Sequence, residues 1–161
     1  MSMPFLAEYA ENALLALELA EREAAHLAYT HKTLFAQGVD LAWVKDLANR
    51  EDLAEKIDAF VVRFGRLQDH IGEKLIPRFA KLMGEQPNSL LDVLAYAERM
   101  QWLDNAEEFV GAGKLRNLLV HESMVDAQIF LEAMTAADAA TRMLLEIVTR
   151  MRNFAQGIGL S

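Results

Sequence analysis

Apolar residues recur at alternating intervals of three and four along three long stretches of this 161-residue chain. In residues 4–37 the stripe is Leu6, Ala10, Ala13, Leu17, Ala20, Ala24, Leu27, His31 and Leu34. The same spacing returns in residues 51–83 and 126–156. It places the apolar residues on one face of a helix, which must then be buried against other helices. We therefore expect an all-α fold, an antiparallel helical bundle of four to five main helices.

Residues that cap, end or break helices divide the chain into segments. The expected helices cover residues 4–37, 40–48, 51–83, 89–100, a segment capped by Asp104, and residues 126–156. The predicted N-caps are Asp40, Ser89 and Asp104, the last helix is expected to start near Asp126, and Pro4 suits a first turn. Pro77 lies inside the second long stretch, so a kink or break is expected near Ile76. No segment alternates apolar and polar residues as a strand does.

Two glycines stand in the segment that Asp104 is expected to cap. Gly111 and Gly113 are each costly in a helix interior. Either that helix begins nearer Lys114, or backbones approach closely at the glycines.

Composition bounds the kind of protein. The length fits a single domain, residues 1–161. There is no cysteine, which excludes disulfides, cysteine-based zinc sites and thiol catalysis. Charges break every apolar stretch well short of the roughly 18 residues of a membrane span, and no signal peptide is visible. We expect a cytoplasmic protein with no membrane partner and no cofactor.

The formal net charge of -8 argues against broad electrostatic binding to a nucleic-acid backbone. A few local cations can still oppose this mean charge at an RNA-cutting site. The acidity suits a basic protein partner, or it serves solubility alone.

Polar residues interrupt an otherwise apolar run near residue 120. They are Arg116, Asn117 and His121. On a helix, Asn117 and His121 lie one turn apart on a shared face. Arg116 precedes His121 by five residues, about 140° around the axis and roughly 7.5 Å along it. A flexible arginine, a helix end or a second copy of the chain would have to bring the two side chains together.

This spacing is common by chance. In the structural alternative, Arg116 pairs with a nearby glutamate and His121 makes a hydrogen bond in the core.

The arginine–histidine run resembles the motif of the HEPN superfamily of helical toxin ribonucleases, most closely its HepT branch. Residues 116–121 read Arg-Asn-Leu-Leu-Val-His, which matches an arginine, a polar residue and a later histidine on the penultimate long helix. Residues 64–77, Phe-Gly-Arg-Leu-Gln-Asp-His-Ile-Gly-Glu-Lys-Leu-Ile-Pro, resemble the second helix of HepT-like proteins. Residues 100–109, Met-Gln-Trp-Leu-Asp-Asn-Ala-Glu-Glu-Phe, resemble the approach to the motif helix. The similarity spans about residues 55–155.

The resemblance implies a metal-independent endoribonuclease that acts as a homodimer, with two motif helices lining one cleft. His121 would be the general acid and base, Arg116 would bind and neutralise the transition state, and Asn117 would support them. RNA supplies its own nucleophile, the ribose 2′-hydroxyl. The family also implies a partner, a nucleotidyltransferase antitoxin, as in a type VII-style toxin–antitoxin pair.

One position departs from the family pattern. HepT proteins usually carry His-x-Tyr after the motif, and the antitoxin attaches AMP to that tyrosine. Here the position is Ser123, which is a possible modification position. The partner could instead silence this protein by binding alone. The second function class is therefore a non-catalytic accessory protein that binds a nucleotidyltransferase.

Other residues are weaker candidates. Candidate RNA-binding cations are Arg63, Arg66, Lys74 and Lys114. Asp69, His70 and Glu73 form either a solvated face or part of a hard-metal site that would need further carboxylates. We expect His31, Trp43 and Trp102 to be core or interface residues. We expect no metal site.

Overall fold

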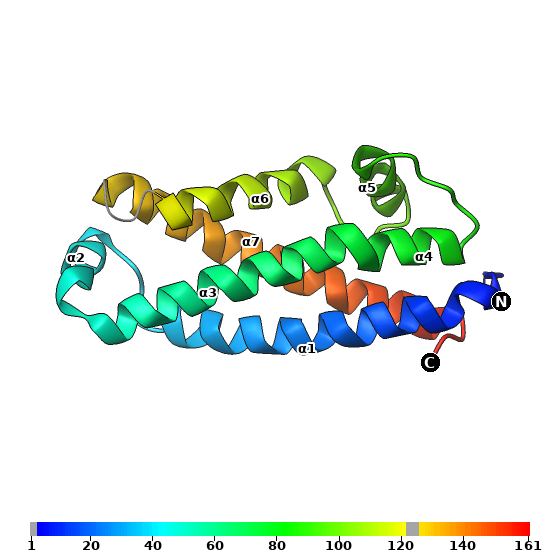
Figure 1. The fold of residues 1–161 in the computed structure, drawn as a ribbon, viewed down its shortest axis with the longest axis horizontal. Coiled ribbons are helices and arrows are strands. Elements are labelled where there is room, and N and C mark those ends of the chain that lie inside the picture. The colour runs from blue at the N-terminus through cyan, green and yellow to red at the C-terminus, as the bar shows by residue number, and fades with distance from the viewer. Residues whose placement is uncertain (1–2, 122–125) are drawn as a thin grey trace.

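The computed structural model describes residues 3–121 and 126–161, and of His121 it describes the backbone alone. The described residues form an all-α helical bundle without strands (Figure 1), as the apolar spacing predicts. The helices are α1 (Ala10–Phe35), α2 (Leu41–Lys45), α3 (Glu51–His70), α4 (Ile76–Leu82), α5 (Leu90–Arg99), α6 (Ala106–His121) and α7 (Ala127–Gly157). Short 3-10 turns, Ala7–Tyr9 and Asp46–Asn49, precede α1 and α3.

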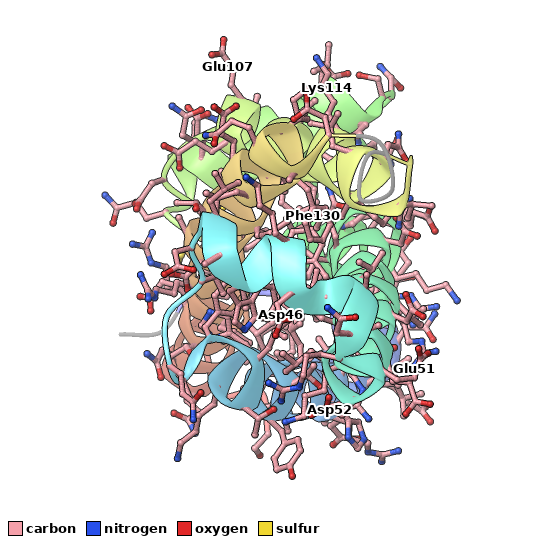
Figure 2. All side chains as sticks on the ribbon, turned by 90° about the vertical axis from the view of Figure 1, so that its left-hand side faces the viewer. Asp46, Glu51, Asp52, Glu107, Lys114 and Phe130 are labelled. Carbon is pink, nitrogen blue, oxygen red and sulfur yellow. The ribbon has the colours of Figure 1, made fainter. Side chains whose placement is uncertain are left out.

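The long helices run alternately in opposite directions along one axis. In Figure 1, α1 runs from right to left, α3 and α4 return, α6 runs back, and α7 closes the bundle. Looking along this axis, Figure 2 shows Phe130 between the helices and charged side chains spread around the outside. No helix among the described residues has both the length and the apolarity needed to cross a membrane.

A π-helical turn interrupts the second long stretch. α3 ends at His70, the turn covers Ile71–Leu75, and α4 starts at Ile76 with Pro77 near its start. Proline has no N–H to donate to the preceding turn, so a widened turn before it removes the conflict. The predicted break near Ile76 is confirmed.

Two of the three predicted N-caps are confirmed. Side-chain oxygens of Asp40 and Ser89 accept hydrogen bonds from N–H groups of the next turn at 2.8 and 3.2 Å. Asp126, near which the last helix was expected to start, caps α7 in the same way at 2.9 Å. The first-turn position of Pro4 is wrong, because helical structure starts only at Ala7.

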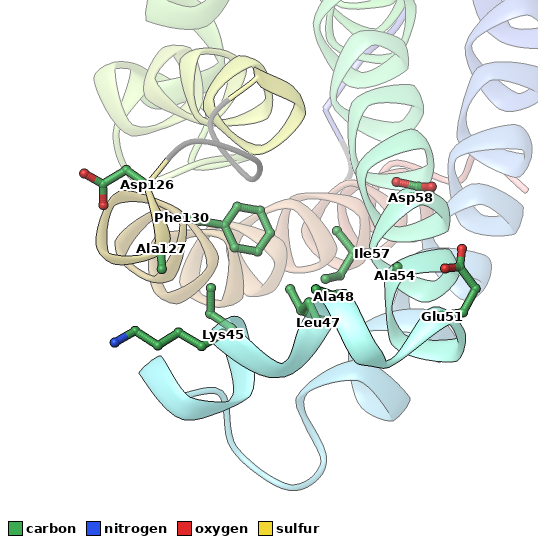
Figure 3. Close-up of a pocket in the computed structure, with 11 residues that line it drawn as sticks. Lys45, Leu47, Ala48, Glu51, Ala54, Ile57, Asp58, Asp126, Ala127 and Phe130 are labelled. Carbon is green, nitrogen blue, oxygen red and sulfur yellow. The ribbon is translucent and has the colours of Figure 1, made fainter.

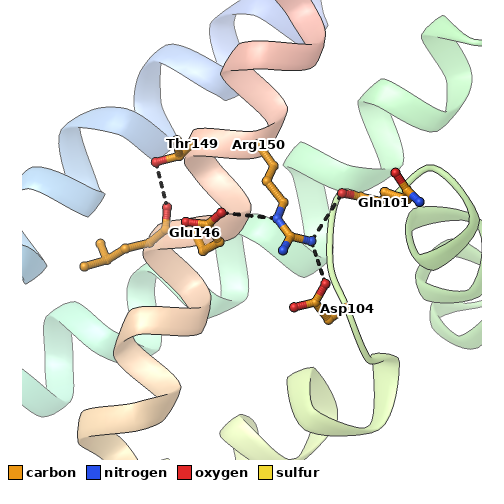
Figure 4. Close-up of polar contacts among 6 residues, drawn as sticks. Gln101, Asp104, Glu146, Thr149 and Arg150 are labelled. Atoms are coloured by element: carbon orange, nitrogen blue, oxygen red, sulfur yellow. Dashed lines mark hydrogen bonds and ion pairs between the residues drawn. The ribbon is translucent and has the colours of Figure 1, made fainter.

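The third predicted cap, Asp104, is wrong. Asn105 caps α6 instead, and its Oδ1 accepts hydrogen bonds from the N–H groups of two following residues at 2.8 and 3.2 Å. Asp104 pairs with Arg150 of α7 at 2.8 Å (Figure 4). Arg150 also donates to the backbone oxygen of Gln101, the described non-glycine residue with a positive φ, 61°. A single arginine of α7, Arg150, thus holds the loop that precedes α6.

The predicted stripe of residues 51–83 forms the centre of the core. Its residues are Phe60, Phe64 and Leu67 on α3 and Ile71 and Leu75 in the π-helical turn, and all are fully buried. On α3, Val62 points outward and is 54% exposed. One continuous cluster of buried side chains joins α1, α3, α6 and α7.

The burial of one face of α3 predicts how substitutions on that helix change the free energy of unfolding. We expect Phe64→Ala to lower the free energy of unfolding by about 3–5 kcal/mol, because it removes a fully buried ring and leaves a cavity. Val62→Ala, on the same helix, should change it by less than about 0.5 kcal/mol. Denaturant unfolding measures both, and equal losses would contradict the burial of this face.

Candidate functional site

Helix α6 packs on α3 and α7 and carries the arginine–histidine motif. Phe109, Ala112 and Leu119 form its buried side. Its other side is also partly apolar, since Leu118 is 42% and Val120 53% exposed. A helix with apolar residues on both sides leaves one apolar surface without a partner in this chain.

Arg116 lies where α6 crosses α3. Its Nη1 donates to Oδ2 of Asp69 at 3.0 Å, and its side chain remains 32% exposed. The aliphatic part of Arg116 lies directly over Gly65, since a Cβ built there would stand 2.5 Å from Arg116 Cδ. The arginine is therefore a surface group in an ion pair, and its partner is an aspartate of α3 and not a glutamate.

The other two motif residues occupy the end of the same helix. Asn117 is exposed. Because α6 is helical through His121, Asn117 and His121 stand one turn apart, as the sequence predicts. The His121 side chain lies outside the described part of the structure, and so does Ser123.

The candidate RNA-binding cations do not gather in one place. Arg63 donates to the backbone oxygen of His26 at 3.2 Å and also to the Thr30 hydroxyl, so it joins α3 to α1. Arg66 is exposed near α1. Lys74 lines a shallow groove between α1 and α4 together with Arg22 and Arg78, and Lys114 is exposed on α6. Of these cations, only Lys114 shares a helix with Arg116.

The glycines of α6 mark a close approach between two helices. The helix starts at Ala106, so they lie inside it. A Cβ at Gly113 would stand 2.9 Å from Nε2 of Gln68 on α3. That Nε2 donates to the backbone oxygen of Phe109 at 3.2 Å, and the amide oxygen of Gln68 has no partner among the described residues. The expected later start near Lys114 is wrong. At Gly113 the side chain of Gln68, and not the backbone of α3, comes close to α6, while Gly111 faces open space.

The expected solvated face at Asp69, His70 and Glu73 is only partly solvated. His70 is buried, and its Nε2 donates to the backbone oxygen of Ala16 at 2.7 Å. Asp69 holds Arg116. Within residues 3–121 and 126–161, no group of three metal-binding side chains is found.

A second polar group lies beside His70. Burial raises the pKa of the Glu23 carboxyl above its ordinary value, and the positive charges of His70 and Arg66 oppose that rise. Oε2 of Glu23 is buried without a hydrogen-bond partner among the described residues. The ionised form of Glu23 is therefore poorly solvated in the folded chain.

The residues expected in the core or at an interface, His31, Trp43 and Trp102, are all at least partly buried. Trp102 is 1% exposed and packs edge-on against Phe79. Trp43 is half-buried. His31 is also half-buried and joins α1 to α7 through a 2.7 Å contact with Asp138.

A cavity of about 620 Å3 lies between α2, the start of α3 and the start of α7 (Figure 3). Ile57 and Phe130 contribute to its apolar lining, and its charged residues are Lys45, Glu51, Asp58 and Asp126, three carboxylates to one cation. Asp126 is already occupied as the cap of α7. Carboxylates around an apolar floor do not suit a phosphate, so this cavity is a poor RNA site.

Comparisons with family models, with curated proteins and with solved structures found no match to this chain. The sequence indicated Asp69 only as part of a solvated face or a metal site. It did not identify Asp69 as the partner of Arg116, or Gly65 as the point where Arg116 lies on α3.

The raised pKa of the buried Glu23 carboxyl predicts how the stability of the fold depends on pH. Since the pKa of Glu23 is higher in the folded chain than in the unfolded chain, its ionisation destabilises the fold at neutral and higher pH. We expect Glu23→Gln to raise the melting temperature at neutral pH. The gain should shrink as the pH falls toward the ordinary glutamate pKa of about 4.3. Thermal melts across pH measure this. Glu55→Gln, at an exposed position of α3, is the control and should show no such trend.

Proposed function

We propose that this chain is a HepT-like endoribonuclease of the HEPN superfamily, the toxin of a type VII-style toxin–antitoxin pair. The observation that carries the proposal is the position of Arg116. Its guanidinium is partly exposed, at the surface of the helix that also presents Asn117 and ends at His121. An arginine used only to fill the core would not leave donors near solvent.

The proposed chemistry needs few groups. The ribose 2′-hydroxyl attacks the adjacent phosphate, the bond to the 5′-oxygen breaks, and a cyclic phosphate remains. His121 takes the hydroxyl proton or returns one to the leaving oxygen, because histidine titrates near neutral pH. Arg116 neutralises the charge that develops on the phosphate oxygens, and Asn117 orients the histidine or the phosphate. No metal is required.

We propose that the active form is a homodimer with both α6 helices facing one cleft. Leu118 and Val120 support this, because each is an exposed apolar side chain of α6 next to the motif that a second copy would bury. A dimer would also bring the arginine of one copy toward the histidine of the other. This removes the difficulty of a straight helix that aims the two residues in different directions.

The test of the enzyme is direct. The wild-type protein is expected to cleave RNA in the presence of EDTA and to leave cyclic phosphate ends, while His121→Ala and Arg116→Ala should each lose at least about a hundredfold in rate. Gel analysis with end-group mapping measures both products and rates.

The matched control is His26→Ala, a histidine of α1 that is exposed and outside the motif. Equal cleavage by wild type and by well-folded His121→Ala would assign the activity to a contaminant. Growth arrest on induced expression, with loss of RNA integrity in wild type alone, would establish the toxin role.

The proposed dimer predicts that a charge placed in its interface changes both the mass of the protein and its activity. Leu118→Glu should convert a dimer to a monomer and reduce RNA cleavage, because it buries a charge in the proposed interface. Leu91→Glu, at a 71% exposed position of α5, should change neither. Light scattering after size exclusion measures the mass. A monomeric wild type that cleaves RNA would contradict the proposed dimeric site.

One observation favours the alternative, a non-catalytic accessory partner of a nucleotidyltransferase. The Arg116 guanidinium is already paired with Asp69, and the chain is acidic overall. A binding protein would use these features without cutting RNA. Stable binding of a small nucleotidyltransferase, together with no RNA cleavage by the free protein, would select this alternative.

A further inference from the structure

Helix α3 presents three residues to α6 within little more than one turn: Gly65, Gln68 and Asp69. Each meets a different part of the motif helix. Gly65 lies under the stem of Arg116, Gln68 bonds to the backbone oxygen of Phe109, and Asp69 pairs with the guanidinium. We call these three residues the α3 cradle.

The glycine of the cradle decides where Arg116 lies. A Cβ at residue 65 would stand 2.5 Å from Arg116 Cδ and 2.6 Å from Nη1. Such distances are well inside van der Waals contact, so any larger residue there would push the side chain off α3. Only glycine lets the arginine lie flat against the helix at this point.

The side-chain amide of Gln68 fixes the position of α6 along α3. Gln68 is buried, and its Nε2 reaches Phe109 at 3.2 Å beside the backbone of Gly113. A buried amide that bonds to one backbone oxygen resists sliding of the two helices, because sliding would leave it unpaired. The register between Arg116 and Asp69 follows from this contact.

The carboxylate of Asp69 orients Arg116 but adds little to the free energy of unfolding. Asp69 is 52% exposed and Arg116 32% exposed, and ion pairs this open are screened by water. Among the described residues, the contact with Asp69 is the one hydrogen bond of the guanidinium. Its remaining N–H donors are held in one orientation and are free of protein partners in that part of the chain.

We propose that Asp69 is a positioning residue of the active site, which acts through Arg116 and not on RNA directly. This inference rests on the proposed endoribonuclease. Asp69 turns one edge of the guanidinium toward α3 and leaves the other edge for a phosphate. Its negative charge also opposes the RNA backbone. It therefore weakens binding of RNA while it speeds cleavage.

Asp69→Ala is expected to lower both KM and kcat, which have opposite effects on kcat/KM. Asp69→Ala removes a negative charge from the phosphate site, so KM for RNA falls severalfold at low salt. The same change frees the guanidinium to rotate, so kcat falls by about tenfold or more. A residue that only stabilised the fold would not lower both constants together.

The experiment compares four proteins on one short RNA at fixed salt. They are wild type, Asp69→Ala, Asp69→Glu and Glu73→Ala. Asp69→Glu keeps a carboxylate for Arg116 and should recover most of kcat. Glu73→Ala removes an equal charge from an exposed position of the following turn and should lower KM slightly without loss of kcat. An unchanged kcat in Asp69→Ala, or an equal loss in Glu73→Ala, would overturn the proposal.

A second measurement separates this inference from the proposed function. NMR signals of the Arg116 guanidinium N–H groups, assigned with Arg116→Lys, should show slow rotation in wild type and fast rotation in Asp69→Ala and Gly65→Ala. If wild type cleaves no RNA, the proposed function fails, and Asp69 then has no role in catalysis even if it holds the guanidinium. If wild type cleaves RNA but the guanidinium rotates freely, the enzyme stands and the positioning role of Asp69 fails.

Discussion

The close approach of α3 and α6 is the contact on which the candidate site depends. A Cβ at Gly65 would stand 2.5 Å from the side chain of Arg116, and a Cβ at Gly113 would stand 2.9 Å from that of Gln68. Gln68 uses the space at Gly113 to reach the α6 backbone, and Arg116 uses the space at Gly65 to reach Asp69. Glycine is unfavourable inside a helix, so the chain accepts a local cost at two positions for this packing.

The surroundings of the site follow from the same arrangement. The loop before α6 is held by Arg150, which pairs with Asp104 and with the backbone oxygen of Gln101. The break before Pro77 turns α4 so that its side chains continue the core begun by α3. The motif helix is thus fixed at its start by an arginine of α7 and along its length by α3.

The cations predicted to bind RNA show how charge is distributed on this acidic chain. Arg63 joins α1 to α3, and Lys74 lies in the groove between α1 and α4. Within one chain, the positive charge available near Arg116 is therefore small. A dimer would double it by adding a second α6, which is a physical reason for the proposed assembly beyond the exposed apolar side chains of Leu118 and Val120.

The sequence by itself determined the all-α class, the helix order, most caps and the buried faces, because these follow from local spacing and from short-range hydrogen bonds. It missed Asn105 as the cap of α6, since Asp104 offered an equally good side chain and only Arg150 decided between them. It also singled out Arg116 but not its partner. Asp69 lies 47 residues away in the chain, and only the packing of α6 on α3 brings the two within 3.0 Å. Tertiary structure decided that contact because helix register, set by glycines and a buried amide, is not written in either helix alone.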